Sequence, residues 1–365
     1  MSGFKITLFP FLPIAGAIIL ALGFFLCSGC YTLKQGTAML GYLGKAIPLE
    51  ELADRGGPGA AGENRAFVER VADIRRFAME DLGLAESKNY TRYVEIDRDY
   101  LAAVVSACAA DSFTRHEWRF PVVGTVPYKG FFDPKDAGKE AARLKKDGLD
   151  VWIRGVDAFS TLGWFRDPLY SYMKNYQVHQ LADLIIHELL HATVFIKGHS
   201  AFNEQLAEFV GTQGARIYTE SRFGADSPEY RAIDESIAAT EAFRRYLGGL
   251  IGELEGVYGD SGLDREAKLA EKERIITAAK ERFEEALASG QISERYRFFS
   301  ELPVNNAYLD LYRLYYEEDR FFEDLYKKNP GDLGEAADLR RFIGAAKTLN
   351  PKKGDLRDQL EKALK

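Results

Sequence analysis

The feature that most constrains this chain is the segment Leu184–His191, which reads LIIHELLH. Its apolar residues recur at helical spacing, so the segment predicts a helix that is buried over most of its surface. His187 and His191 are four residues apart, which places both imidazoles on one side of the helix, where they can share a metal ion. Glu188 is rotated too far round to bind the same ion, but it can approach a metal-activated water and act as general base.

A buried HExxH helix needs partners for its polar groups, because unpaired polar groups inside a protein cost several kcal/mol. A zinc ion supplies such partners, and a catalytic zinc site has three protein ligands with a fourth position open. Asn203 is a good N-cap, so a second helix is expected to begin at Glu204. We assign Glu204 as the third ligand and Glu208 as an outer residue that accepts the Nδ1 proton of a ligating histidine. The reverse assignment of the two glutamates stays open.

The N-terminal residues have the layout of a secretory signal. The run Ile6–Leu26 is uncharged and mostly apolar, Lys5 precedes it, and Ser28 and Gly29 stand before Cys30. This layout resembles a bacterial lipoprotein signal, with Cys30 as the lipidated residue and residues 1–30 as the signal segment. The alternative is an uncleaved membrane anchor, for which about 20 apolar residues suffice. Either interpretation predicts a bacterial cell-envelope protein whose remaining residues lie outside the cytoplasmic membrane.

The rest of the sequence predicts an α+β fold that is mainly α. A flexible break is expected over residues 55–62 and an amphipathic helix over 63–82. Strands are expected at 93–96, 118–126 and 151–159, with a helix at 134–146 before the last one. A small sheet is thus followed by a large C-terminal helical part, with helices expected at 169–196, 204–219, 227–258, 263–289, 305–328 and 333–349. The net charge of −7 offers no basic surface for nucleic acid, so DNA and RNA are not expected as partners.

Six longer segments follow one another along the chain: GCYTLKQG, PVVGTVPYKGFFD, RGVDAFSTLGWFRDPL, HELLHATVF, AFNEQLAEFVGTQGA and LPVNNAYL. Together they resemble the predicted bacterial aminopeptidase family, whose members are typically lipoproteins. The pairing of HExxH with a downstream Asn-Glu helix also resembles the gluzincin metallopeptidases, although His191 and Glu204 are closer in sequence than in that group. The resemblance implies one zincin-like domain over residues 31–365 that binds one Zn²⁺ and cleaves peptide or protein substrates as an aminopeptidase.

The resemblance also suggests where other parts of a peptidase site would lie. In zincins a strand upstream of the metal-binding helix holds the extended substrate. The segment 151–159 is placed to be that strand, and an ordinary sheet strand is the equal alternative. Asp157 within it either grips a substrate α-ammonium group or serves as a turn or capping residue. Tyr308, next to the family-like Asn-Asn-Ala segment, is the preferred hydrogen-bond donor to the transition state. The substrate-strand residues we single out are Gly155, Val156, Asp157 and Ala158.

Two other functions fit parts of the sequence. One keeps the metal but uses it for structure, or for hydrolysis of a non-peptide amide. The other is a lipid-tethered envelope protein whose site is vestigial. A vestigial site would lack a motif residue, and a structural zinc usually has four protein ligands. The complete motif, with Glu188 retained, favours hydrolysis.

Overall fold

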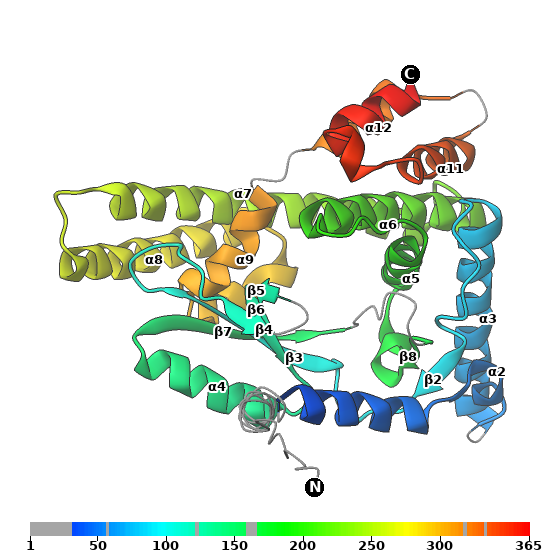
Figure 1. The fold of residues 1–365 in the computed structure, drawn as a ribbon, viewed down its shortest axis with the longest axis horizontal. Helices are drawn as coiled ribbons and strands as arrows, with labels where there is room; N and C mark the ends of the chain where they lie inside the picture. Colours follow the sequence, from blue (N-terminus) through cyan, green and yellow to red (C-terminus); the bar gives the residue numbers. More distant parts are fainter. Residues whose placement is uncertain (1–30, 56–57, 121–123, 158–165, 317–319, 332–333) are drawn as a thin grey trace, which may run out of the picture.

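A computed structural model describes residues 31–55, 58–120, 124–157, 166–316, 320–331 and 334–365 (Figure 1). The fold is α+β and mainly α, as the sequence predicts. Within the described residues, no helix is long and apolar enough to cross a membrane. The predictions for residues 1–30, including Cys30, and for Ala158 lie outside the described part of the chain.

The larger sheet has three antiparallel strands in the order β6, β3, β7. Its central strand β3 (Ala102–Ala109) pairs with β6 (Tyr128–Phe131) and along its whole length with β7 (Leu149–Val156). The sequence analysis did not predict β3 or β6. Seven of the eight β3 residues are buried, so the strand lacks the alternation of apolar and polar residues by which half-buried strands are recognised.

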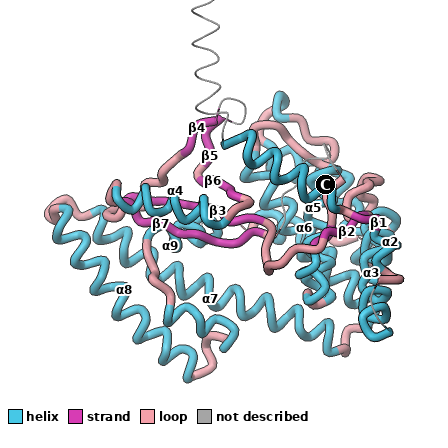
Figure 2. Tube along the Cα trace, turned by 90° about the horizontal axis from the view of Figure 1, so that it is seen from below, coloured by secondary structure: helices cyan, strands magenta, loops and turns pink. Residues whose placement is uncertain are grey.

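Helices cover both faces of this sheet. Helix α4 (Pro134–Lys146) packs on one face, where Val105 and Leu144 share a core cluster. Helix α9 (Asn306–Tyr316) packs on the other face. On its far side α9 contacts α7 (Pro228–Gly259), which in turn packs against α8 (Arg265–Ala288). Figure 2 shows β3 and β7 between α4 and these long helices.

Two smaller β-structures complete the strand content. The predicted strand at 118–126 is instead a hairpin of β4 (Trp118–Phe120) and β5 (Gly124–Val126). In a second sheet, β2 (Arg92–Val94) lies between β1 (Ile47–Pro48) and β8 (Leu169–Tyr170). The predicted helix at 169–196 is therefore wrong at its start, where β8 and the 3-10 turn η1 (Ser171–Asn175) precede the helix.

The other helices correct several expected boundaries. The expected flexible break is wrong for residues 58–62, which form the first turns of α3 (Pro58–Glu80). The expected helix at 305–328 is two helices, α9 and α10 (Phe321–Lys328). Residues 31–45 are helical, and β1 separates them from α2 (Leu49–Leu52). The C-terminal helices are α11 (Glu335–Ala346) and α12 (Leu356–Leu364), and the remaining 3-10 turns are η2 (Glu294–Glu301) and η3 (Pro351–Lys353).

Helices α5 (Val178–Thr193) and α6 (Ser200–Phe223) lie close together in the main hydrophobic core. Their close approach depends on Gly211 of α6, because a Cβ there would overlap the Oδ1 atom of Asp183 and lie 3.1 Å from the Cβ of His187. Gly214, one turn on, is almost as tight, since its Cβ would lie 3.0 Å from the Cδ1 of Ile186. Glycine on α6 thus brings the HExxH helix and the Glu204 helix together.

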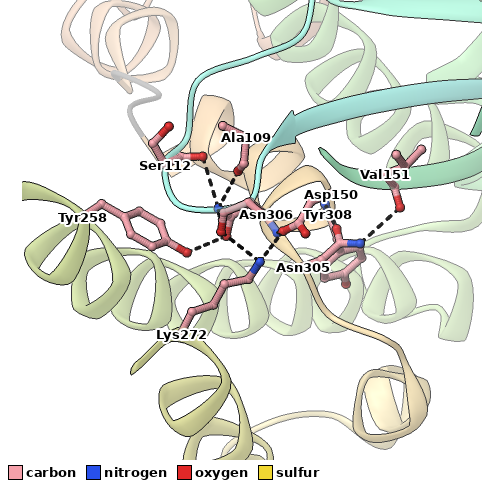
Figure 3. A network of polar contacts seen from close by, with 10 residues as sticks. Ala109, Ser112, Asp150, Val151, Tyr258, Lys272, Asn305, Asn306 and Tyr308 are labelled. Carbon is pink, nitrogen blue, oxygen red and sulfur yellow. Dashed lines mark hydrogen bonds and ion pairs between the residues drawn. The ribbon is translucent and has the colours of Figure 1, made fainter. Parts of the chain in front are cut away.

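A buried polar network joins the sheet to the C-terminal helices (Figure 3). The Asn306 side chain is fully buried, and its amide donates to the carbonyls of Ala109, Ala110 and Ser112 at 2.9, 3.2 and 3.1 Å. The buried ammonium group of Lys272 lies 2.5 Å from the carboxylate of Asp150 on β7. Each buried polar group in this network therefore has a partner, as stability requires.

Candidate metal centre

Three predicted ligands lie together at the contact between α5 and α6. The Nε2 atoms of His187 and His191 are 3.2 Å apart. They lie 3.7 and 3.6 Å from the carboxylate oxygens of Glu204. The His191 side chain is 5% exposed and the Glu204 side chain 63% exposed, so the cluster is closed on the α5 side and open beside Glu204. The structure places Glu204, and not Glu208, beside the two histidines.

The charges of this cluster favour a cation at its centre. Hydrogen bonds from His187 and His191 lower the pKa of Glu204 to about 2. Burial alone would lower the pKa of His187, but the hydrogen bond to Glu204 and the nearby carboxylates outweigh it, so the pKa is raised. Positive charge on the His187 imidazole is thus stabilised in this structure. Two imidazole nitrogens and a carboxylate oxygen are also a donor set that zinc accepts.

Asn203 orders the turn that connects the two helices. Its side-chain oxygen accepts from the backbone N–H of Ile196 at 3.0 Å, and its amide donates to the Ile196 carbonyl at 2.9 Å. The interpretation of Asn203 as an N-cap is wrong, because α6 already begins at Ser200 with His199 at the N-cap position. Asn203 lies in the first turn, is 2% exposed, and holds the segment that leads into Glu204.

The outer contacts of the cluster differ from the expected ones. Glu208 lies 3.0 Å from the guanidinium of Arg244 on α7, and among the described residues it makes no hydrogen bond to a ligating histidine. The buried Nδ1 atom of His191 has no hydrogen-bond partner there. Asp183, one turn before His187 on α5, is instead the carboxylate against which Gly211 packs. Burial raises the pKa of Asp183 to about 7.

Glu188 lies beside the cluster, and one of its carboxylate oxygens makes no hydrogen bond with the described residues. Its Oε2 atom is buried and has no hydrogen-bond partner among the described residues. Burial raises the pKa of Glu188, and the charges of His187 and His191 oppose this rise. A buried carboxylate of raised basicity next to a candidate metal site can accept a proton from water.

Tyr90, whose hydroxyl feels the charge of Glu188, has an unusual backbone conformation. Its φ of 59° makes it the one non-glycine residue with positive φ in the described chain. It is buried, its backbone N–H donates to the carbonyl of Asp167 at 2.7 Å, and the charge of Glu188 contributes to raising the pKa of its hydroxyl after burial itself. Strained positions of this kind concentrate at functional sites. The sequence analysis did not single out Tyr90, because no local pattern signals a positive φ at tyrosine.

The predicted substrate strand is the edge strand β7. On one side it pairs with β3, and on the other the carbonyl of Val151 accepts from the side chain of Asn305 at 3.1 Å. Because backbone groups alternate in direction along a strand, those of Ile153 and Gly155 point to the same outer side as those of Val151. At the end of the strand, the Val156 carbonyl accepts from the N–H of Leu101 at 2.9 Å.

Asp157 follows β7 and is held by two tyrosines before α5. Its carbonyl accepts from the hydroxyl of Tyr172, and its carboxylate accepts from the hydroxyl of Tyr176 at 2.5 Å. This carboxylate thus already accepts a hydrogen bond from a side chain, and Asp157 lies just beyond the strand in which it was predicted. The same contacts tie the end of β7 to the segment that precedes the HExxH helix.

Tyr308 lies in the core of the helical part and not beside the cluster. It is 3% exposed, its ring lies 4.8 Å from that of Trp152, and its hydroxyl lies 3.5 Å from that of Tyr312. Among the described residues it has no recorded contact with His187, His191 or Glu204. The structure therefore gives no support to Tyr308 as a donor to the transition state.

The family model described as "Putative aminopeptidase" matches residues 30–360, which is nearly the whole chain. No curated protein and no solved structure matches the chain significantly. The match includes the HExxH helix, Glu204, β7 and the Asn305–Asn306 pair. It supports a peptidase-like function at the level of the family. The chain therefore belongs to the putative aminopeptidase family.

Proposed function

We propose that this protein is a zinc-dependent metallopeptidase of zincin-like type that acts as an aminopeptidase. The observation that carries the proposal is the group His187, His191 and Glu204, whose ligand atoms lie within 4.8 Å of one another, beside a buried carboxylate with an unused oxygen. The first three residues would hold the ion. When bound there, zinc would polarise the scissile carbonyl and lower the pKa of a water molecule.

The residues of the chain itself supply the remaining steps. Glu188 takes the proton of the attacking water, since its carboxylate is buried and its pKa is raised. It then passes that proton to the leaving amine. The outer edge of β7 offers the backbone groups of Ile153 and Gly155 to an extended peptide, which would add as a further strand.

The number of ligands favours catalysis over a structural zinc site. A structural zinc site is normally closed by four protein ligands, whereas the group found among the described residues has three. Cys108, the cysteine within the described residues, is buried in β3 and belongs to a different contact, between the sheet and α9.

Elemental analysis of the purified protein tests the metal, with matched glutamate variants as controls. We expect about one zinc per chain in the wild type, loss of zinc in Glu204→Gln, and retention of zinc in Glu208→Gln because Glu208 pairs with Arg244. Wild-type protein without metal would refute the proposal.

A peptide-library digest tests the chemistry. Glu188→Gln should keep its zinc and lose cleavage by at least about a hundredfold, because the general base is removed. An aminopeptidase should cleave peptides with a free N-terminus and leave their N-acetylated counterparts intact. Zinc without cleavage of any peptide would favour a structural site or a non-peptide amide hydrolase.

We also propose that the protein is tethered to the membrane of a bacterial cell envelope through residues 1–30, by a lipid on Cys30 or by an uncleaved anchor. The uncharged run of residues 6–26 and the small residues before Cys30 support this proposal. Mass spectrometry of the N-terminal peptide from the membrane fraction tests it, since a lipid on Cys30 adds a fixed mass. A soluble, unmodified N-terminus starting elsewhere would refute it.

A further inference from the structure

The helix over residues 31–45 joins the proposed anchor segment to the folded domain without a linker. Its first described residue, Tyr31, is docked, because its hydroxyl donates to the carbonyl of Gly130 on β6 at 2.5 Å and its ring packs 5.5 Å from that of Phe131. Further along, Gln35 accepts from the N–H of Phe132 at 2.9 Å. The helix is therefore fixed to the sheet from its first turn onward.

One face of this helix makes these contacts. Tyr42 completes it, since its hydroxyl accepts from the guanidinium of Arg98 at 2.7 Å and its ring lies 5.7 Å from that of Phe132. Tyr31, Gln35 and Tyr42 recur at helical spacing, which places them on one side. The helix thus lies lengthwise along the domain, as Figure 1 shows beside α4 and α2.

The opposite face is exposed, apolar and uncharged. Leu33 and Leu40 are 69% and 57% exposed. At about 100° per residue they lie about 200° and 180° round the helix from Tyr31. Added Cβ atoms at Gly36, Gly41 and Gly44 would meet nothing within 4 Å. Between residues 31 and 45 the chain has two lysines, Lys34 and Lys45, and no acidic residue.

We propose that this face of the 31–45 helix lies on the lipid bilayer that carries the proposed N-terminal anchor. A lipid on Cys30 would hold the next residue, the docked Tyr31, at the membrane surface, and an anchor that ends at Leu26 would leave only four residues between the membrane and Tyr31. The exposed leucines then insert into the interface, while Lys34 stays paired with Asp136 of α4. The domain is consequently held in one orientation, with the helix along the membrane plane. This inference rests on the proposed tether and is independent of peptidase activity.

Lipid photolabelling of the full chain tests the orientation. Protein purified from the membrane fraction is reconstituted into vesicles of phosphatidylethanolamine and phosphatidylglycerol that contain a carbene-forming diazirine lipid. Trypsin releases residues 35–45, which contain Leu40, between Lys34 and Lys45. It also releases residues 223–231, which contain Phe223, 43% exposed at the end of α6. We expect the first peptide to carry at least several-fold more label than the second.

Paired variants separate the helix from the tether. Leu33→Glu with Leu40→Glu should remove the label from residues 35–45 while the protein still floats with the vesicles, and Phe223→Glu should leave that label unchanged. Protein that floats with equal label on both peptides, or with no label on residues 35–45, overturns the inference while the tether stands. Protein that does not float overturns both. A dimer cross-linked through residues 35–45 overturns the inference, because a second copy of the chain would then cover this face in place of the bilayer.

Discussion

The contact between α5 and α6 gives the sharpest test of the site's architecture, through Gly211→Ala. The new methyl group would overlap the Oδ1 atom of Asp183 and lie 3.2 Å from the Asp183 carbonyl oxygen and 3.1 Å from the Cβ of His187. Rotation of the Asp183 side chain would relieve only the first of these contacts, because the Asp183 carbonyl oxygen and the His187 Cβ are fixed to the backbone of α5. The helices must therefore separate slightly, and His187 must move with α5.

The expected magnitude follows from two opposing effects. Alanine is favoured over glycine in a helix by about 1 kcal/mol. Overpacking a tight contact costs about 1–3 kcal/mol. Gly252→Ala on α7 is the matched control, because its Cβ would meet nothing within 4 Å and it shows the helix-propensity gain alone. The two variants should therefore differ by about 1–3 kcal/mol in unfolding free energy.

Scanning calorimetry and zinc titration read out this difference. For a chain of this length about 0.7 kcal/mol corresponds to one degree, so Gly211→Ala should melt about 1.5–4 °C below Gly252→Ala. It should also bind zinc more weakly than Gly252→Ala, because His187 is displaced. Equal melting temperatures and equal zinc affinities for the two variants would refute the close approach of α5 and α6 at Gly211.

Three further predictions concern regions outside the metal cluster. Hydrogen bonds from Arg222 and Tyr218 lower the pKa of Asp73, so its contribution to stability is present above its unfolded pKa of about 4 and lost as the pH falls below that. The gap in unfolding free energy between wild type and Asp73→Asn should thus be larger at pH 7 than at pH 3, as urea titrations would measure; a gap that grows at low pH contradicts it. Asn306→Ala should cost about 3 kcal/mol or more in urea unfolding, because it strands several buried groups, and equality with wild type would contradict the network in Figure 3. Burial raises the pKa of Cys108 to about 12, so peptide mapping should find it unmodified by maleimide at pH 8 until the protein is unfolded, and rapid native labelling would disagree.

Local sequence patterns predicted those helices and strands whose start signals and apolar spacing lie within their own residues. Helix α4 is found at the predicted bounds, because Asp133 and Pro134 start it and its amphipathic spacing continues to Lys146. The strand β7 was found because β-branched and aromatic residues gather between Gly148 and Asp157. By contrast, residues 58–62 contain two glycines yet are helical. Residues 59–62 are mostly exposed, and they continue the part of α3 that packs in the core through Phe67 and Val71.

Local sequence patterns could not predict side-chain contacts between residues that are far apart in the sequence. Glu208 has the right spacing from Glu204 to face the histidines, but its carboxylate pairs with the guanidinium of Arg244 on α7 instead. An aromatic residue at the helical spacing of Tyr308 is more often a core residue than a donor, and the packing of α9 on β7 places its ring against Trp152. Tyr90 has a backbone conformation that its own sequence does not signal.

The sequence by itself determined that His187, Glu188 and His191 share a helix with apolar surroundings, because the 3.6-residue period fixes which side chains point the same way. It also narrowed the third ligand to two glutamates one turn apart. Only the tertiary structure decided between them, because the angle and closeness of α5 and α6 depend on Gly211 and on the hydrogen bonds of Asn203 with the backbone of Ile196. Direction along a helix is a local property, whereas the distance between two helices is set by everything packed between and around them.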